Sequence, residues 1–178
     1  MTSETNIEIR RLDNKDSLEK LTSLIHRAYR QLADLGFRYW GTHQTTEDTK
    51  KRVSNGECYV GVNKSKIIGT ILLTPPCKII GNPYYNRPDV STFHQFAIEP
   101  DFQNKGYGSQ LLNFIENRAI ELGARELACD TADKAVHLID FYLRRGYRKV
   151  DEADWDITNY KSVILSKSLS IKYQCGEW

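Results

Sequence analysis

The sequence lacks a long hydrophobic run. None of its apolar segments approaches the roughly 20 residues that a membrane-spanning helix needs. Its first residues, MTSETNIEIRRLDNKD, include early acidic residues and no apolar core, so they do not resemble a secretory signal. We therefore expect a cytoplasmic protein with no membrane partner.

An excess of charge of one sign is also missing. The 25 lysines and arginines are nearly balanced by 23 aspartates and glutamates, which leaves a formal net charge of +2. The basic residues are dispersed along the chain, and the adjacent Lys50 and Lys51 are typical of a solvated helix face. A nucleic-acid-binding surface needs clustered positive charge, so we expect no DNA or RNA partner.

Cysteine is scarce, and the sequence contains no CxxC pair. The four cysteines stand far apart, at Cys58, Cys77, Cys129 and Cys175. Two of them lie in strand-like runs, where a reduced, buried thiol is the usual state. The four histidines show no metal-ligand spacing with one another or with cysteine, so we expect no metal site.

The length and composition are those of a single folded unit. A chain of 178 residues can bury one sizeable core, and 40% hydrophobic with 27% charged residues is typical of a soluble globular protein. The sequence contains no internal repeat and no low-complexity linker. We therefore predict one domain spanning residues 1–178.

Several short segments show the patterns of strands. Alternating apolar and polar residues predict a strand at residues 7–12. The runs ECYVGVN and KIIGTILLT, with a turn at residues 63–65 between them, predict a hairpin. STFHQFAIEP predicts a strand that Pro100 ends, and ELACDT, YRKV and YKSVILSKSL predict three more. Residues 75–88, rich in proline, asparagine and tyrosine, predict a loop.

Apolar residues recur at helical spacing in the segments between these strands. A cap at Asp13 or Asn14 starts the first predicted helix, and Thr45 or Thr46 starts the second. The apolar positions of the first predicted helix run from residue 18 to residue 35, and the other predicted helices cover residues 46–53, 109–122 and 135–143. Together the elements predict an α/β fold: a central mixed, mostly antiparallel twisted sheet with helices on both faces.

The segment QNKGYG, at residues 103–108, separates a strand-like run from an amphipathic helix. Glycine at a helix N-terminus lets a ligand approach the exposed main-chain amides, and phosphate is a common ligand there. A P-loop is excluded because GxxxxGK[ST] is missing. A dinucleotide-binding fingerprint is excluded because Leu111 replaces the third glycine of GxGxxG and the turn lies past the middle of the chain.

A different pattern, [QR]xxGx[GA], is present as Gln103, Gly106 and Gly108. Its surroundings, FAIEPDFQNKGYGSQLL, keep a strand, a proline, an aromatic residue, the loop and a helix in unbroken order. Downstream, FYLRRGY supplies an aromatic pair before a glycine and a further aromatic residue. These motifs resemble those of the GNAT superfamily of N-acetyltransferases, and the similar order of elements extends from residue 7 to about residue 169.

The resemblance implies acetyl-CoA as the cofactor. In that family the loop binds the pyrophosphate, and the pantetheine arm pairs with the main chain of the preceding strand, where the sheet splays. A helix N-terminus suits this role because its first N–H groups are unpaired and the peptide dipoles add positive charge. The implied cofactor-binding residues are Phe96, Ala97, Ile98, Gln103, Asn104, Lys105, Gly106, Tyr107, Gly108 and Ser109.

The resemblance also implies that Tyr142 is the general acid. A phenol with a pKa of about 10 stays protonated at neutral pH and can give a proton to the departing thiolate. Many relatives carry asparagine seven residues earlier, where this chain has Ala135, so the neighbouring contacts are not carried over. The alternative is that Tyr142 only packs on the apolar helix face beside Leu138.

His94 is the candidate general base, near the position where some relatives hold a glutamate. An unperturbed pKa of about 6.5 lets a histidine accept a proton at physiological pH. Strand alternation predicts that His94 shares a face with Phe96 and Ile98, while Glu99 lies on the opposite face. The alternative is a structural histidine, with Glu99 or water as the base.

Two segments are candidates for the acceptor site. In the family, the segment after the first helix and the loop before the central strand flank the acceptor. The candidate residues are Arg38, Tyr39, Trp40, Tyr84, Tyr85 and Arg87. Their aromatic rings suit an amine or a peptide end, and the alternative is that they pack in the core or at its rim.

The combined reading is direct transfer of an acetyl group from acetyl-CoA to a primary amine, without a metal or a covalent acyl-enzyme. A small-molecule amine is the favoured acceptor. A protein N-terminal or lysine acetyltransferase is the alternative enzyme, and a non-catalytic acyl-CoA-binding sensor is the alternative from another class. A homodimer contact through residues 75–88 is left open.

Overall fold

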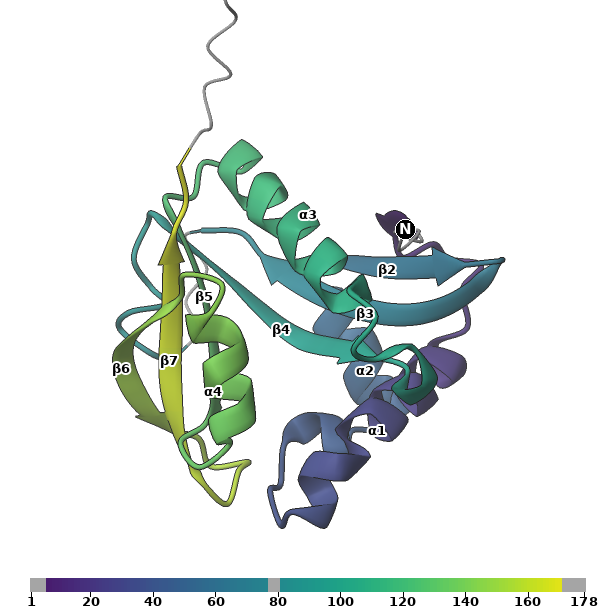
Figure 1. The fold of residues 1–178 in the computed structure, drawn as a ribbon, viewed down its shortest axis with the longest axis horizontal. Helices are drawn as coiled ribbons and strands as arrows, with labels where there is room; N and C mark the ends of the chain where they lie inside the picture. Colours follow the sequence, from purple (N-terminus) through teal and green to yellow (C-terminus); the bar gives the residue numbers. More distant parts are fainter. Residues whose placement is uncertain (1–5, 77–80, 171–178) are drawn as a thin grey trace, which may run out of the picture.

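The described residues build one seven-stranded sheet in the order β1-β2-β3-β4-β5-β7-β6 (Figure 1). The computed structural model describes residues 6–76 and 81–170 of the chain. All neighbouring strands are antiparallel except β4 and β5, which are parallel, so the predicted mixed sheet is confirmed. The strands are β1 (Glu8–Arg11), β2 (Glu57–Asn63), β3 (Lys66–Thr74), β4 (Val90–Ile98), β5 (Glu126–Ala132), β6 (Arg148–Asp154) and β7 (Lys161–Ser168).

Helices cover both faces of this sheet, as predicted (Figure 1). The first two helices lie on one face, and the last two lie on the other. They are α1 (Leu18–Asp34), α2 (Thr46–Val53), α3 (Tyr107–Glu121) and α4 (Val136–Leu143), with short 3-10 turns η1 (Trp40–Thr42) and η2 (Pro100–Phe102). Within residues 6–76 and 81–170, no helix has both the length and the apolar character that crossing a bilayer requires.

The predicted cap of α2 is confirmed, and that of α1 is wrong. Thr45 caps α2 through a capping box with Asp48. α1 is capped by Ser17, whose Oγ accepts a hydrogen bond from the N–H of Lys20 at 3.2 Å. The helix begins later than expected because Asp13 closes a preceding turn by accepting the N–H of Asp16 at 2.9 Å.

The apolar face of α3 anchors this helix on the sheet. Leu111, Leu112 and Ile115 have no exposed surface and belong to the same cluster as Ile68 and Ile71 of β3. Burying each such side chain contributes about 1.5–3 kcal/mol before the cost of ordering it. The N-terminus of α3 is therefore held firmly beside the end of β4.

The two described cysteines lie in the clusters on opposite faces of the sheet. Cys58 packs in the cluster under α1, and Cys129 packs in the cluster under α3. Both thiols are free and buried, as predicted. Cys77 and Cys175 lie outside the described residues.

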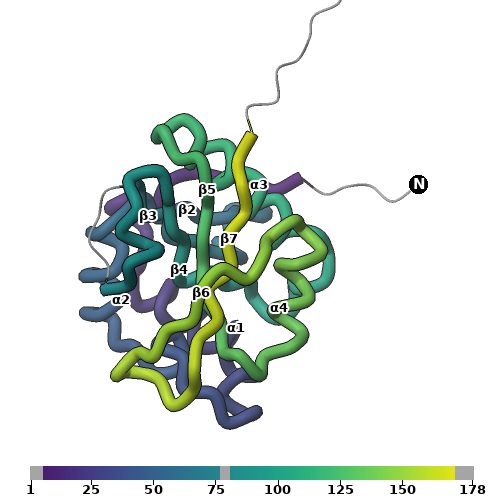
Figure 2. The backbone as a smooth tube through the Cα atoms, turned by 90° about the vertical axis from the view of Figure 1, so that its left-hand side faces the viewer, coloured from purple at the N-terminus to yellow at the C-terminus, as the bar shows by residue number. Residues whose placement is uncertain are grey.

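The sheet opens between its two parallel strands. β4 pairs with β5 only at Val90–Thr92, opposite Glu126–Ala128. Beyond Thr92 the strands diverge, so that β5, β7 and β6 form a separate wing (Figures 1 and 2). The splay that the family resemblance implied is therefore present.

A β-bulge interrupts β4 at this opening. Between His94 and Ala97 the strand carries one residue more than β3 does, and Gln95 adopts a positive φ of 53°. As a result Phe96 packs with Phe93 on the α3 side, whereas His94 faces Asp130 on the other side. The prediction that His94 shares a face with Phe96 is wrong, because strict alternation fails at a bulge.

A bidentate ion pair joins β2 to α3. The Nε and Nη2 groups of Arg118 donate to the two carboxylate oxygens of Glu57 at 2.8 and 2.9 Å. Hydrogen bonding to Arg118 lowers the pKa of Glu57 from 4.5 to about 2. The carboxylate therefore stabilises the fold at pH values above 4.5, and this contribution is lost as the pH falls toward 2.

We expect Glu57→Gln to lower the free energy of unfolding by about 1 kcal/mol at pH 7, after screening by solvent. Urea unfolding at pH 7 and pH 3 would measure the loss, which should shrink at pH 3 because this pH lies below the unfolded-state pKa of 4.5, so that Glu57 takes up a proton on unfolding. Glu121→Gln is the control, since its carboxylate also accepts from Arg118 but is 63% exposed. An equal loss in both variants at both pH values would contradict this prediction.

Candidate active site

A cavity of about 1240 Å³ lies where β4 and β5 diverge. Its wall combines these strands with the start of α3, α4, part of α1 and the segment between β6 and β7. The structure thus brings together residues that lie far apart in the sequence. The lining includes the predicted site residues Tyr39, Trp40, Tyr85, His94, Phe96, Ala97, Ile98, Gln103, Asn104, Gly106, Gly108, Ser109 and Tyr142.

The glycine loop places the N-terminus of α3 at the cavity wall. Gly106 caps the helix in the left-handed conformation, with a φ of 85°. The N–H of Gln110 donates to the Gly106 carbonyl at 3.1 Å, so the preceding N–H groups of the first turn have no acceptor within the helix. A Cβ at Gly106 would meet no protein atom within 4 Å, which leaves the space beside these amides open.

Two close contacts hold the loop and the helix against β4. The Gln103 Nε2 donates to the carbonyl of Ile98 at 3.0 Å and ties the loop to the end of the strand. A Cβ at Gly108 would lie 3.3 Å from Phe96 Cζ, tighter than an ordinary van der Waals contact. Glycine at this position therefore lets α3 approach the strand.

Lys105 and Tyr107 belong to the predicted loop but do not line the cavity. The Lys105 Nζ donates to the carbonyl of Asp101 at 2.7 Å. The ring of Tyr107 is buried, with its centroid 6.0 Å from that of Phe102. Their main-chain N–H groups are what these two residues can offer a ligand at the helix N-terminus.

The main chain of Phe96, Ala97 and Ile98 forms one edge of the cavity. On one side of this segment, Ala97 and Ile98 pair with Thr70 and Gly69 of β3. On the other side, β5 has already separated, since its pairs with β4 end at Thr92. A strand edge of this kind can pair with an extended, amide-containing ligand.

Arg145 lines the cavity beside the first turn of α3 and was not singled out from the sequence. Its guanidinium donates to Ser109 Oγ and lies 3.6 Å from the centroid of the Phe141 ring. Burial lowers the pKa of this guanidinium, and the neighbouring Arg144 lowers it further. Two arginines beside a helix N-terminus favour a polyanionic ligand, and the RR of FYLRRGY was the available signal.

Tyr142 lies in the cavity wall within an aromatic cluster. It is 8% exposed, and its ring packs on Phe93, Phe141 and Tyr147. Burial raises the pKa of Tyr142 well above the usual 10, so its hydroxyl stays protonated at neutral pH. Ala135, which replaces the asparagine of many relatives, is buried in a separate apolar cluster.

His94 faces Asp130 across the opening between β4 and β5. Its Nδ1 lies 3.9 Å from Asp130 Oδ1, and its Nε2 is buried without a hydrogen-bond partner among the described residues. Burial lowers the pKa of His94 below the usual 6.5, while the charge of Asp130 acts in the opposite direction. A neutral imidazole with its Nδ1 proton facing Asp130 leaves Nε2 free to accept a proton.

Asp130 is itself held by three donors from different segments. Tyr85, Trp155 and Ser162 each donate a hydrogen bond to its carboxylate at 3.0 Å. Tyr85 comes from the loop before β4, and Trp155 follows β6. The carboxylate beside His94 is therefore oriented by both flanks of the opening.

Glu99, the alternative base, is bound elsewhere. The Nε and Nη2 groups of Arg27 donate to its two oxygens at 2.9 and 3.1 Å. Glu99 is 7% exposed and does not line the cavity. Of the two proton-accepting side chains considered, only His94 borders the cavity.

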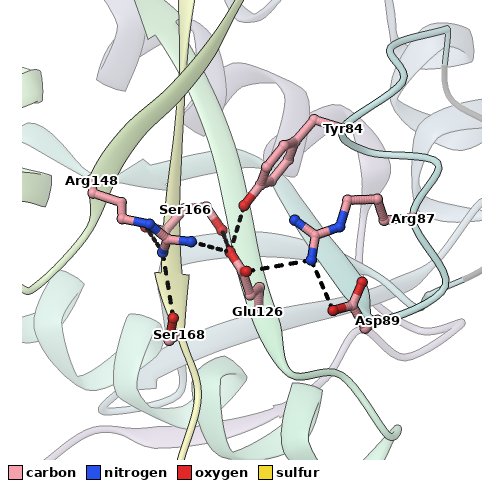
Figure 3. A network of polar contacts seen from close by, with 7 residues as sticks. All are labelled: Tyr84, Arg87, Asp89, Glu126, Arg148, Ser166 and Ser168. Atoms are coloured by element: carbon pink, nitrogen blue, oxygen red, sulfur yellow. Dashed lines mark hydrogen bonds and ion pairs between the residues drawn. The ribbon is translucent and has the colours of Figure 1, made fainter.

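Three of the acceptor-site candidates also lie away from the cavity lining. Arg38 is exposed, and its main-chain N–H donates to Asn159 Oδ1 at 2.8 Å. Tyr84 and Arg87 both contact Glu126 in a polar network that joins the loop between β3 and β4 to β5 and β7 (Figure 3). Among the described residues of this loop, Tyr85, which lies between them, lines the cavity.

Further cavity residues carry no recognisable sequence signal. They are Tyr29, Arg52, Asp130, Trp155 and Tyr160. The Tyr29 ring lies 5.7 Å from that of Tyr39, and the Tyr160 ring lies 4.7 Å from it, measured between centroids. Spacing alone assigns such aromatic residues to core packing, so only the folded arrangement identifies them as cavity wall.

A splayed mixed sheet with a helix N-terminus at its opening is the arrangement expected of a GNAT-type transferase. The family model described as "Acetyltransferase (GNAT) family" matches residues 19–147. The chain therefore belongs to the GNAT acetyltransferase family, and it is an N-acetyltransferase.

Comparisons with individual proteins indicate the same family. The chain is 33% identical over 146 residues to the S-(2-succino)cysteine N-acetyltransferase of Bacillus subtilis (strain 168), covering 81% of this chain and 86% of that protein. It is 26% identical over 159 residues to the S-alkylcysteine N-acetyltransferase of the same organism, covering 84% and 83%. A GNAT family acetyltransferase from Elizabethkingia anophelis, solved with acetyl-CoA bound, shares the fold with a TM-score of 0.66 at 18% identity, covering 93% and 99%.

We expect His94 to titrate below pH 6.5, because burial disfavours its charged form. Asp130→Asn should lower this pKa further, since the Asp130 charge raises it. NMR titration of the labelled histidine rings would measure both values. Asp133→Asn, which removes an exposed acid beyond the end of β5, is the control and should leave the His94 titration unchanged. A higher His94 pKa in Asp130→Asn would contradict the assignment.

Proposed function

We propose that the protein transfers an acetyl group directly from acetyl-CoA to the primary amine of a small molecule. The observation that carries the proposal is one continuous cavity, which joins the N-terminus of α3 to the side chains of His94 and Tyr142. Two similar proteins are N-acetyltransferases of S-(2-succino)cysteine and of S-alkylcysteine, which supports a small acceptor. Tyr39, Trp40 and Tyr85 line the part of the cavity that we assign to this acceptor.

The residues at the α3 end fit acetyl-CoA. The free amides after Gly106 and the side chain of Arg145 suit its pyrophosphate, and the open edge at Phe96–Ile98 suits its amide-containing arm. Gln103 and Gly108 keep the loop and helix in place, while Asn104 and Ser109 complete the wall. When bound, acetyl-CoA supplies a thioester whose acyl carbon an uncharged amine attacks, with release of a free thiol.

His94 would accept the proton that the acceptor amine must lose before it can attack. A lysine-like amine has a pKa of about 10.4 and is almost entirely protonated at neutral pH, so a proton acceptor is required. The lowered pKa of His94 keeps its imidazole neutral, the residue lines the cavity, and its buried Nε2 has no hydrogen-bond partner among the described residues. We assign proton acceptance to this nitrogen, with Asp130 offsetting part of the cost of the imidazolium.

Tyr142 would donate to the sulfur of the leaving group. Its raised pKa keeps the hydroxyl protonated, so it can donate a hydrogen bond or a proton to the departing sulfur. The packing of Phe93, Phe141 and Tyr147 restricts the ring, which reduces the entropy lost on positioning the hydroxyl. The base and the acid are thus both held in the uncharged form that each role needs.

Acetyl-CoA should raise the melting temperature of the protein, and Gly106→Glu should abolish this shift because a carboxylate would enter the anion site. Gly123→Glu is a matched control. Both glycines flank α3 with φ near 85°, at 85° and 86°, and a Cβ at either meets no protein atom within 4 Å. Both variants therefore introduce a similar backbone strain, and only Gly106→Glu should lose the thermal shift with acetyl-CoA. No shift in the parent protein would exclude the cofactor assignment.

Tyr142→Phe should lower kcat by about 10²-fold to 10⁴-fold while leaving KM for acetyl-CoA little changed. Free-thiol detection with a panel of primary amines would measure turnover, the panel including S-alkylcysteines, lysine and a short peptide. Tyr147→Phe is the control, since it deletes a neighbouring buried hydroxyl that donates to Glu116 outside the cavity lining. Unchanged kcat in Tyr142→Phe would leave Tyr142 as a packing residue, and turnover of the peptide alone would contradict a small acceptor.

A further inference from the structure

Arg52 brings a positive charge to the cavity wall from the last turn of α2. The side chain is half-buried, and its guanidinium lies 4.6 Å from the centroid of the Trp40 ring. Its Nη1 donates to Gln44 Oε1 at 2.9 Å. No ion pair within 4.0 Å involves this guanidinium among residues 6–76 and 81–170.

The other half-buried arginines show why this is unusual. Arg10, Arg87 and Arg118 each form an ion pair with a carboxylate, whereas Arg52 and Arg145 form none within the described part of the chain. Both of the latter line the cavity. A partly desolvated charge is costly unless a counter-charge compensates it, so each of these two arginines calls for an anion in the cavity.

The two arginines lie at different ends of the cavity. Arg145 contacts Ser109 of α3, on one face of the sheet. Arg52 extends from α2, which packs with α1 on the other face. Burial lowers the pKa of Arg52, and the charges of Asp130 and Asp48 only partly offset this. The anion that complements Arg52 is therefore separate from one held at the N-terminus of α3.

Gln95 adds a second unsatisfied donor at this end. Its Oε1 accepts from Gln44 Nε2 at 3.1 Å, which leaves its own Nε2 to face another acceptor. That Nε2 is buried without a partner among the described residues, and Gln95 lines the cavity. Gln44 thus joins Arg52 to Gln95 and holds both donor groups on one side.

We propose that Arg52 and the Gln95 amide bind a carboxylate of the acceptor, whose amine is thereby directed to Nε2 of His94. The acceptor is then an amino acid instead of a simple amine. The planar guanidinium matches a carboxylate with two parallel hydrogen bonds, and the indole of Trp40 limits its rotation. This inference rests on the proposed function and names the substrate class of the same site.

Matched acceptor pairs that differ only in the carboxylate test it. Each pair in the thiol-release assay is an S-alkyl- or S-benzyl-cysteine and the corresponding S-substituted cysteamine. We expect the parent enzyme to prefer the amino acid by about 10-fold to 100-fold in kcat/KM, the effect of a charge-assisted hydrogen-bonded pair. At a pH well above the His94 pKa, Arg52→Gln should remove this preference by lowering kcat/KM for the amino acid, while the cysteamine stays within about twofold. The pH matters because the charge of Arg52 also lowers the pKa of His94.

Two further variants and one binding measurement complete the test. Arg52→Lys should restore part of the preference, and Lys51→Gln, an exposed cation on the same helix, should change nothing. Arg52→Gln should keep the acetyl-CoA thermal shift; if it does not fold, the parent's preference alone decides. Equal kcat/KM for the two members of each pair in the parent, or an equal loss for both in Arg52→Gln, would overturn the inference while the proposed function stands. Absence of turnover with every amine would instead remove the proposed function itself.

Discussion

The early separation of two parallel strands is the constraint on which the rest of the structure depends. β4 and β5 share hydrogen bonds only over Val90–Thr92, and each then follows its own wing of the sheet. Main-chain groups in the interior of a sheet normally pair on both edges, so the divergence exposes one edge of β4 to a ligand. Anchoring of α3 on β3 and β4 brings a second set of free amides to the same opening. The cavity is thus lined by main-chain groups at Phe96–Ile98 and at the start of α3 that are open to a ligand within the described part of the chain.

Burial sets the protonation states of His94 and Tyr142, which both line the cavity. The same desolvation lowers the pKa of His94 and raises that of Tyr142, because in each case it disfavours the charged form. A neutral imidazole and a protonated phenol result at neutral pH, which matches the needs of a base and an acid. Asp130, fixed by three hydrogen bonds, keeps negative charge beside the imidazole. Arg52, from α2, and Arg145, which follows α4, bring positive charge to the cavity from different elements of the fold.

Predictions based on local patterns succeeded where one segment decides its own structure. The strand runs, the hairpin and the start of α2 at Thr45 or Thr46 depend on residues close in sequence, and all three are confirmed. The cap of α1 was missed because Asp13 and Ser17 are both good caps, and a turn preceding the helix decides between them. Alternation along β4 failed at Gln95, since a bulge depends on the register with β3 and not on the strand alone.

By itself the sequence determined the order of the elements and the glycine loop before α3, because periodicity and short motifs encode them locally. Its resemblance to the GNAT superfamily implied Tyr142 as the candidate acid. Only the tertiary structure decided which side chains meet in the cavity. Tyr85 reaches Asp130, whereas its neighbours Tyr84 and Arg87 turn to Glu126. These partners are far apart in the sequence, with separations of 45 residues for Tyr85 and Asp130 and 42 for Tyr84 and Glu126. Which side chains become partners depends on the order of the strands in the sheet and on desolvation, and a single segment of sequence encodes neither.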